Sequence, residues 1–289
     1  MKLSVIICTH NPRPDHLART AAGLGLQTLA THAWELIVID NASVPPVDAA
    51  TFRASHPSIR VVREPTLGLV AARLRGIREA TGDLLVFVDD DNVLAPNYLQ
   101  LATEIAGRVP KLGAFGGQVH GEFETPPPSW FRHRLDRLAI TEFSVASQTG
   151  QTDGSLAPCG AGLCVKAEVA TAYRSQAESD PRRQLLGRSG RNLGSGDDTD
   201  LALTACDMGY EMGRFPELHL VHLIPSGRLS ARYLARVTRG HAQAQLRLLT
   251  LRKKGDGHAR KMWHARFALW KWTVADVLFS LFPKRSQPQ

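Results

Sequence analysis

Cysteine is scarce in this sequence, with four residues among 289. Small secreted proteins depend on many disulfide bonds because they lack a large core, and a chain of this length has no such need. The nearest pair, Cys159 and Cys164, does not have the two-residue spacing of a zinc knuckle. The sequence therefore excludes a disulfide-rich secreted protein and a cysteine-based zinc module, and we expect a cytoplasmic protein.

Long apolar runs are missing as well. The first run, Leu3–Cys8, ends at Thr9 after six residues, whereas the apolar core of a signal peptide needs about 7–15. Hydrophobic residues make up 43% and charged residues 21% of the chain, as in ordinary globular proteins. This composition excludes a multi-pass membrane protein and a disordered chain.

Acidic residues are nearly absent from the C-terminal part. From Arg228 to the end, fourteen lysines and arginines accompany only Asp256 and Asp276, whereas the whole chain has a net charge of +8. The part before Arg228 is therefore mildly acidic. We divide the chain into a folded domain over 1–225, with halves 1–120 and 121–225, and a basic helical tail over 226–289.

Strand-like and helix-like segments alternate in the first half. Short apolar, β-branched runs are typical of strands buried on both faces, and longer helical patterns separate them. We expect strands at 3–8, 35–39, 59–62, 84–88 and near 114–119, and helices at about 15–29, 69–80 and 96–108. This order predicts an α/β fold with a Rossmann-like, mostly parallel sheet flanked by helices.

The second half is less regular. Pro158–Lys166 has the pattern of a strand that contains glycines. A helix is expected at 198–208, followed by two short strands at 210–215 and 217–222. From Ser230 onward the pattern is helical, which predicts a C-terminal helical extension.

Three acidic residues follow the strand predicted at 84–88. Asp89, Asp90 and Asp91 repel one another, and the carboxyl edge of such a sheet is where open α/β folds bind ligands. Along an extended chain Asp89 and Asp91 point the same way, so both can bind one divalent cation such as Mg²⁺ or Mn²⁺. A solvated turn before the next helix is the alternative.

Other polar residues should lie at the same edge. Thr9 and Asn11 follow the first strand, and Asp40 ends the second. Arg73 lies on the helix before the fourth strand, where an ordinary surface charge is the alternative. A divalent cation, a carboxylate that can pair with a base and a nearby arginine together fit a nucleoside diphosphate.

Four segments together resemble the family 2 glycosyltransferases of the GT-A fold. They are SVIICTHN, ELIVIDNAS, GLVAARLRGIREATGDLLVFVDDDN and GSGDDTDLALTACDMGY, in the family's order over about residues 2–225. A Rossmann dehydrogenase is disfavoured because no G-x-G-x-x-G follows the first strand. The resemblance implies an inverting, metal-dependent transfer of a sugar from a nucleoside-diphosphate sugar to an acceptor hydroxyl.

The resemblance also implies roles at the nucleotide end of the site. Thr9 and Asp40 match positions that hold the nucleobase, and Asn11 lies beside them. Arg73 matches the arginine of the family's A-R-N-x-G stretch, near the base or the diphosphate. This sequence has Leu74 where that stretch has asparagine.

The acidic triplet matches the family's DxD motif. Asp89 is expected toward the ribose and the metal, Asp91 on the metal, and Asp90 as a supporting residue of the nucleotide site. His222 is similar to a late histidine that completes the metal site in such enzymes, with a structural hydrogen bond as the alternative. Arg228 follows it and is expected near the diphosphate, unless it simply begins the basic tail.

The catalytic base is expected at the start of the helix over 198–208. The family's Glu-Asp pattern maps the base to Asp198, with Asp197 near the diphosphate or the acceptor; the helix dipole alone would also favour acids there. Gly160 and Gly162 resemble the strand that backs the donor sugar, or they form a bulge. The Q-x-x-R-W run of the processive members is absent from the sequence, so we expect transfer of one sugar at a time.

Other functions stay open from the sequence. A non-catalytic nucleotide-sugar binding module and a sugar-nucleotide pyrophosphorylase are the alternatives, although the latter ordinarily has a glycine-rich loop after its first strand. The expected donor is a UDP-sugar, and the expected acceptor is a glycan or a lipid-linked molecule in envelope or exopolysaccharide assembly. No nucleic-acid partner is expected, because no reading motif accompanies the basic charge.

The basic tail contains an apolar stripe. On a helix over 262–282, one face collects Trp263, Phe267, Trp270, Val274, Val277, Leu278 and Leu281. Charged residues interrupt the segment, so it is a poor membrane-spanning helix. It fits an amphipathic helix on the anionic inner face of the cell membrane, and packing against the domain or a second subunit is the alternative.

Overall fold

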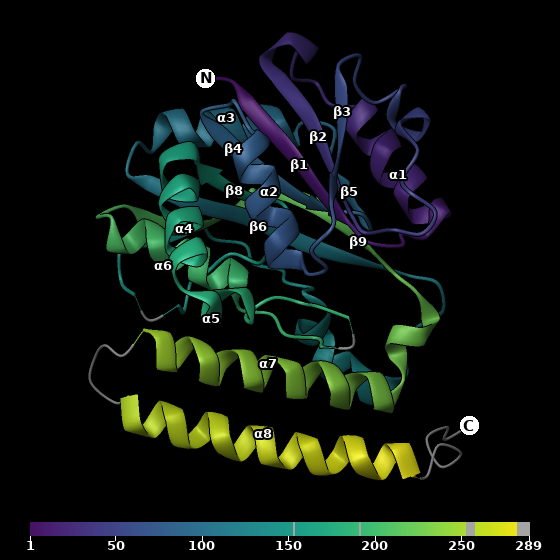
Figure 1. The fold of residues 1–289 in the computed structure, drawn as a ribbon, viewed down its shortest axis with the longest axis vertical. Helices are drawn as coiled ribbons and strands as arrows, with labels where there is room; N and C mark the ends of the chain where they lie inside the picture. Colours follow the sequence, from purple (N-terminus) through teal and green to yellow (C-terminus); the bar gives the residue numbers. More distant parts are fainter. Residues whose placement is uncertain (153, 191, 253–257, 282–289) are drawn as a thin grey trace.

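One sheet runs through the protein (Figure 1). The computed structural model describes residues 1–152, 154–190, 192–252 and 258–281, and within these ranges nine strands form a sheet in the order β3-β2-β1-β4-β8-β6-β9-β5, with β7 paired to β9. The strands are β1 (Leu3–Thr9), β2 (Trp34–Asn41), β3 (Ile59–Glu64), β4 (Leu84–Asp89), β5 (Asn92–Leu94), β6 (Leu112–Phe123), β7 (Ser147–Thr149), β8 (Leu163–Lys166) and β9 (Glu211–Ile224).

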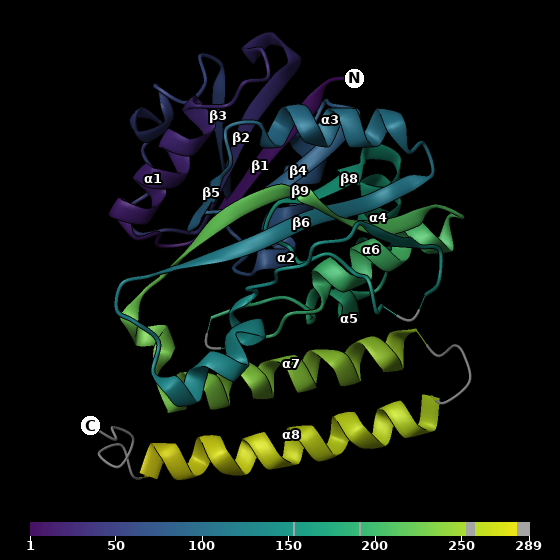
Figure 2. The same ribbon diagram turned by 180° about the vertical axis from the view of Figure 1, so that it is seen from behind.

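Helices cover both faces of the sheet (Figure 2). The α-helices are α1 (Pro14–Gly25), α2 (Leu69–Glu79), α3 (Tyr98–Arg108), α4 (Ala167–Ser179), α5 (Pro181–Gln184), α6 (Asp197–Asp207), α7 (Ala231–Leu251) and α8 (His258–Leu281). Apolar side chains of α1 and α3 pack with one face of the sheet, and those of α2, α4 and α6 pack with the other. Within β1, Val5 and Ile7 belong to the first core and Ile6 to the second, which explains why nearly the whole strand is apolar.

The predicted α/β fold class is confirmed. Strands β3, β2, β1 and β4 are parallel neighbours, and their observed bounds lie within two residues of the predicted ones. Helix α1 ends at Gly25, four residues before its predicted end. The side-chain amide of Gln27 donates to the carbonyl oxygens of Gly23 and Ala95, which satisfies a free carbonyl at the helix end.

The second half of the sheet departs from the expected detail. The two short strands predicted at 210–215 and 217–222 are one strand, β9, which runs beside β6. The predicted break coincides with Pro216, which cannot donate a backbone hydrogen bond. The strand continues past this proline, but its register with β6 shifts there. Strand β8 pairs antiparallel with both β4 and β6, and β5 pairs antiparallel with β9.

Two long helices end the described chain, as the predicted helical extension requires. The hydroxyl of Ser230 accepts a hydrogen bond from the amide of Tyr233 and caps α7. Helix α7 lies under the sheet domain, and α8 packs along the far side of α7 (Figures 1 and 2). Over the described residues, none of the helices combines the length and apolar character needed to cross a membrane. The division of the chain at residue 225 stays a prediction.

Candidate active site

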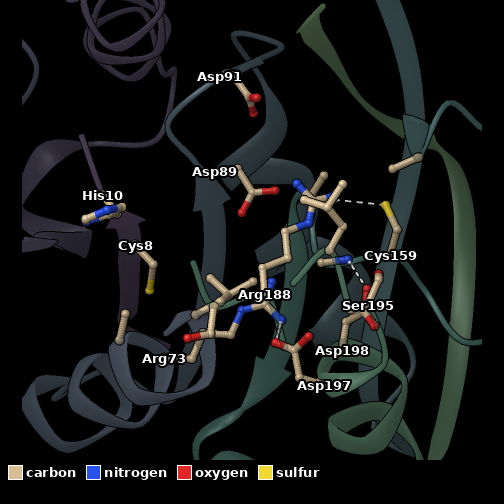
Figure 3. Close-up of a pocket in the computed structure, with 18 of the residues that line it drawn as sticks. Cys8, His10, Arg73, Asp89, Asp91, Cys159, Arg188, Ser195, Asp197 and Asp198 are labelled. Carbon is tan, nitrogen blue, oxygen red and sulfur yellow. Dashed lines mark hydrogen bonds and ion pairs between the residues drawn. The ribbon is translucent and has the colours of Figure 1, made fainter. Parts of the chain in front are cut away.

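A cavity of about 390 Å³ opens beside the carboxyl ends of β1 and β4 (Figure 3). The sequence predicted ligand binding at this edge of the sheet. The lining includes residues from the ends of β1, β4 and β9, the segments 159–161, 188–190 and 192–195, the start of α6, and the middle of α7. Segments that are more than a hundred residues apart in the sequence therefore line the same cavity.

The acidic triplet forms one wall of the cavity. Asp89 ends β4, and burial together with the charge of Asp91 raises the pKa of its carboxyl. Thr9 donates a hydrogen bond from its hydroxyl to Asp90, whose pKa is raised to about 7 by burial and by Asp91. Asp91 is buried, and it is held by the side-chain amide of Asn92 at 3.1 Å.

Strand pairing brings a histidine to this wall. Asn92 on β5 lies opposite His222 on β9, so His222 is next to Asp91, with 3.4 Å between Nε2 and a carboxylate oxygen. The Nδ1 atom of His222 is 2.9 Å from the carbonyl oxygen of Leu138 and donates its proton there. The Nε2 atom therefore carries the ring's lone pair, on the side of the ring that faces Asp91.

Arg228 lies between these two groups. Its Nη1 atom is 3.0 Å from a carboxylate oxygen of Asp91 and 3.0 Å from Nε2 of His222. Although burial disfavours a charge at Asp91, the adjacent guanidinium of Arg228 holds the pKa of that carboxyl below its usual range. The guanidinium is a cation bound by a carboxylate and an imidazole lone pair.

This donor set fits a divalent cation. A carboxylate oxygen and a histidine nitrogen fixed in one tautomer are ordinary metal ligands. Among the described residues there is no group of three or more acidic, histidine or cysteine side chains with metal-binding geometry. Further ligands would therefore come from a bound phosphate and from water, which is how Mg²⁺ is commonly held.

The opposite wall carries a second acidic pair, at the start of α6. Asp197 is buried and forms an ion pair of 2.5 Å with Arg73, which is 3% exposed. The guanidinium of Arg73 lies over the ring of Phe87, 5.5 Å from its centre. Gly160 leaves room for this guanidinium, because a Cβ atom at that position would collide with it.

Asp198, next to this ion pair, faces the cavity and is half-buried. Its carboxylate accepts hydrogen bonds from the backbone amides of Gly160 at 2.9 Å and Thr199 at 2.7 Å. Burial and the neighbouring charge of Asp197 raise the pKa of Asp198. The wall thus presents one oriented carboxylate with an increased affinity for a proton.

Comparison with known proteins shows the family of this chain. Residues 4–168 match the family model "Glycosyl transferase family 2". The chain belongs to this family. The GT-A fold expected from the sequence is also found in solved structures that are similar to this glycosyltransferase.

Relatives and structural neighbours give the extent of the likeness. The succinoglycan biosynthesis protein ExoM of Rhizobium meliloti is 26% identical over 276 residues, which cover 93% of this chain and 81% of ExoM. The uncharacterized glycosyltransferase YwdF of Bacillus subtilis is 32% identical over 106 residues, and the match spans 36% of this chain and only 38% of YwdF.

Among solved structures, the mannosyltransferase PcManGT of Pyrobaculum calidifontis, in complex with GDP-Man and Mn²⁺, has a TM-score of 0.57 at 19% identity. The match covers 97% of this chain and 75% of that one. S. aureus TarS 1–349 in complex with UDP-GlcNAc has a TM-score of 0.53 at 16% identity, over 99% and 77% of the two chains. These likenesses establish the fold of this glycosyltransferase.

Most of the predicted site residues meet in the cavity. Those that line it are Thr9, Arg73, Asp89, Asp90, Asp91, Gly160, Asp197, Asp198, His222 and Arg228. Within the part of the chain that the structure describes, Asn11, Asp40 and Gly162 are not part of the lining. Most residues that the sequence analysis assigned to one site therefore lie close together in the structure. Their individual roles stay predictions.

Two of these three residues have side-chain contacts that hold the backbone. The carboxylate of Asp40 accepts from the amide of Ser43 at 3.0 Å and pairs with Arg63, and the side-chain oxygen of Asn11 accepts from the amide of Val44. These bonds fix the turns after β1 and β2.

Gly162 also has a structural requirement for its lack of a side chain. It has a φ of +72°, and a Cβ atom there would strike the hydroxyl of Tyr98. The same hydroxyl donates a 2.6 Å hydrogen bond to the carbonyl oxygen of Gly162.

The sequence analysis did not include three basic residues of the cavity wall: Arg137, Arg188 and His241. His241 lies in the middle of α7, and burial together with Arg137 and Arg188 lowers its pKa to about 4. No motif marks these positions: Arg137 lies in a 3₁₀ helix (Ser129–Leu138), Arg188 in an irregular segment, and His241 in the predicted basic helical tail. Only the excess of basic residues in these segments was visible in the sequence.

Proposed function

We propose that this glycosyltransferase moves one sugar at a time from a nucleoside-diphosphate sugar to an acceptor hydroxyl, with inversion at the anomeric carbon and with Mg²⁺ or Mn²⁺ bound. The observation that carries the proposal is the pair of walls in one cavity. Asp91 and His222 present cation ligands on one wall, and Asp198 presents an oriented carboxylate on the other.

The first wall suits a diphosphate. A bound divalent cation supplies charge neutralisation for the departing nucleoside diphosphate. Asp91 and His222 are the residues that would hold it, with Asp89 beside them. Arg228, which bridges the two ligands here, then becomes free to pair with a phosphate oxygen.

The second wall suits proton removal from the acceptor. An inverting transfer needs a carboxylate within hydrogen-bond reach of the attacking hydroxyl. The amides of Gly160 and Thr199 fix the orientation of Asp198, and its raised pKa strengthens it as a base. The positive charge of Arg73 balances Asp197, so that the wall presents a single acceptor of a proton.

The relatives favour a role in glycan assembly. ExoM is named for succinoglycan biosynthesis, and a relative from Sinorhizobium fredii, 27% identical over 234 residues, is named an N-acetylglucosaminyltransferase. PcManGT was solved with GDP-Man and TarS with UDP-GlcNAc, so neighbours of this fold bind either nucleotide. We therefore propose an acceptor from envelope or exopolysaccharide synthesis, with a UDP-sugar as the first donor to test.

The test begins with binding. Thermal shifts of the full chain are measured with UDP-, GDP- and dTDP-sugars, each with and without Mn²⁺. We expect one donor class to raise Tm, and to do so more with Mn²⁺ present. The absence of any shift with every donor in the presence of Mn²⁺ contradicts the proposal.

Turnover with the identified donor separates the alternatives. Release of nucleoside diphosphate and NMR of the product's anomeric centre report the reaction and its stereochemistry. Inversion is expected; retention contradicts the assigned mechanism. Binding without turnover over a panel of acceptor glycans favours a binding module, and pyrophosphate-dependent formation of nucleoside triphosphate favours a pyrophosphorylase.

A further inference from the structure

Helix α8 turns its large apolar side chains outward. Six of them are between 43% and 64% exposed: Trp263, Phe267, Trp270, Val274, Val277 and Leu278. The side chain of Leu281, the last member of the predicted stripe, lies outside the described side chains. The sequence left open whether this stripe packs against the domain, and its exposure rules that out for these six residues.

A different face of α8 packs on the protein. Ala265 is 2% exposed and Asp276 is 8% exposed, and both lie on the side of the helix opposite the stripe. Asp276 forms a 2.9 Å ion pair with Arg239 of α7, which fixes the rotation of α8 about its axis. Met262, Leu269 and Trp272 lie on the same side as Ala265 and are half-buried, so helix α8 has two apolar faces, and α7 covers one of them (Figures 1 and 2).

The outer face is a continuous aromatic surface. The rings of Trp263 and Phe267 are stacked, with centres 5.7 Å apart and planes 5° from parallel, and Phe267 lies 5.9 Å from Trp270. Val274 follows one turn later on the same face. Monomeric proteins rarely leave such a contiguous apolar strip in water, so a partner is expected.

Exposed charge along α8 is of one sign. Arg260, Lys261, Arg266 and Lys271 are exposed, whereas Asp276 is the helix's one acidic residue and is buried in its ion pair. On a helical projection, Arg266 borders the stripe on one side and Lys271 on the other. Two copies of this chain joined through the stripe would bring these like charges together, which disfavours a homodimer.

We propose that α8 lies in the interfacial layer of an anionic lipid membrane. The aromatic stripe would enter the boundary between headgroups and acyl chains, and Arg266 and Lys271 would meet lipid phosphates. Tryptophan favours this boundary because its ring is apolar and its indole N–H needs a polar partner. The inference rests on the surface of α8 and holds whatever reaction the cavity performs.

The proposal also places the cavity relative to the membrane. His241 on α7 lines the cavity, and α8 packs against α7, so one helix separates the cavity from the membrane-binding helix. Packed helices have axes about 8–10 Å apart. An acceptor anchored in lipid through a phosphate could therefore reach the cavity from the side of α7.

The experiment is co-sedimentation of the full chain with vesicles. Phosphatidylcholine vesicles are compared with vesicles that contain phosphatidylglycerol, at low and high salt. We expect binding to the anionic vesicles alone, and weaker binding at high salt because ions screen the attraction. A blue shift of tryptophan emission on binding reports burial of the stripe.

Two variants and a control test the surface. Combining Trp263→Ser, Phe267→Ser and Trp270→Ser should weaken binding to anionic vesicles about a hundredfold. Combining Arg266→Glu with Lys271→Glu should weaken it at least about tenfold. The control Leu26→Ser removes an exposed leucine, 67% accessible, far from α8 and should leave binding unchanged.

Each result supports or contradicts membrane binding through the stripe of α8. All substituted side chains are exposed, so circular dichroism and Tm of the variants should match the parent. Failure of the parent to bind anionic vesicles, or unchanged binding by the serine variant, overturns the proposal. A concentration-dependent dimer that the serine variant abolishes, without vesicle binding, assigns the stripe to a second copy instead.

Discussion

The two walls of the cavity use adjacent acids in the same way but hold them differently. In each wall one carboxylate is paired with an arginine, Asp91 with Arg228 and Asp197 with Arg73, and a neighbouring carboxylate faces the cavity. The Arg73 side chain is 4% exposed, whereas that of Arg228 is 25% exposed and lies on a short 3₁₀ helix.

This difference in burial separates a structural ion pair from an exchangeable one. A fully buried pair is costly to break, since the remaining charge has neither water nor a partner. At the edge of the cavity, Arg228 can leave Asp91 for water or phosphate and make room for a cation. The ion pair of Asp197 and Arg73 is therefore a fixed part of the fold, whereas under the proposed function the wall of Asp91 would be completed by a bound cation.

The largest effect is expected for Asp198→Asn. Loss of a general base lowers kcat by about 10²–10⁴-fold, while the donor Kd should stay unchanged because the substitution leaves the Asp91 wall intact. Kinetics and calorimetric donor titration measure the two quantities. Unchanged kcat removes Asp198 from the reaction.

The same variant should not lose stability. The pKa of Asp198 is raised in the folded protein, so the unfolded chain gives up that proton at lower pH, and the charge disfavours folding near neutral pH. Because asparagine has one acceptor oxygen for the amides of Gly160 and Thr199, the lost hydrogen bond offsets this gain, and we expect Tm of Asp198→Asn to stay close to that of the parent.

Its neighbour should behave in the opposite way. Asp197→Asn leaves Arg73 buried without its counter-charge, which should cost about 3–5 kcal/mol in urea unfolding. Glu178→Gln is the matched control, because it breaks the exposed pair with Arg78 and should cost less than about 1 kcal/mol. Equal losses in the two variants would contradict the structural role of the buried pair.

The exchangeable pair should respond to metal. Arg228→Gln removes the guanidinium that competes with a cation for Asp91 and His222, so Mn²⁺ should raise Tm more in this variant than in the parent. A concentration of Mn²⁺ a hundred times its Kd adds about 2.7 kcal/mol. Arg63→Gln, which acts on Asp40 outside the cavity lining, should leave the response to Mn²⁺ unchanged. An equal response in all three proteins argues against a cation at Asp91.

The smallest effect expected is a displaced acid limb. As pH falls through the raised pKa of Asp198, the base becomes protonated and kcat/KM declines. The midpoint should lie above the ordinary aspartate value of about 3.9. The residual activity of Asp198→Asn should lack this limb; if the limb persists, it belongs to another group.

Much of the fold could be predicted because its signals are local. The apolar run of β4 and the acids directly after it fix where Asp89 lies, since a strand buried on both faces must end at the rim of the sheet. Strand β5 was not predicted, because three residues are too few for a periodic signal. Helix α4 was also not predicted, although its side chains fill the core under β8.

The assembly of the site depends on contacts that no local pattern contains. His222 reaches Asp91 only because β9 pairs antiparallel with β5, and Gly160 reaches Asp198 only after β8 pairs with β4. His241 enters the wall because α7 packs under the sheet domain. The sequence contains these residues, but it does not show which residues they contact in space.

The sequence by itself determined the family and the position of both acidic pairs, because these follow from motifs and from where strands and helices end. Tertiary structure decided which acid of each pair is neutralised, since Arg73 is 124 residues from Asp197 along the chain. It also decided which apolar face of α8 is exposed. A helix with two apolar faces has no preference of its own, and only packing against α7 covers one and leaves the other to a partner.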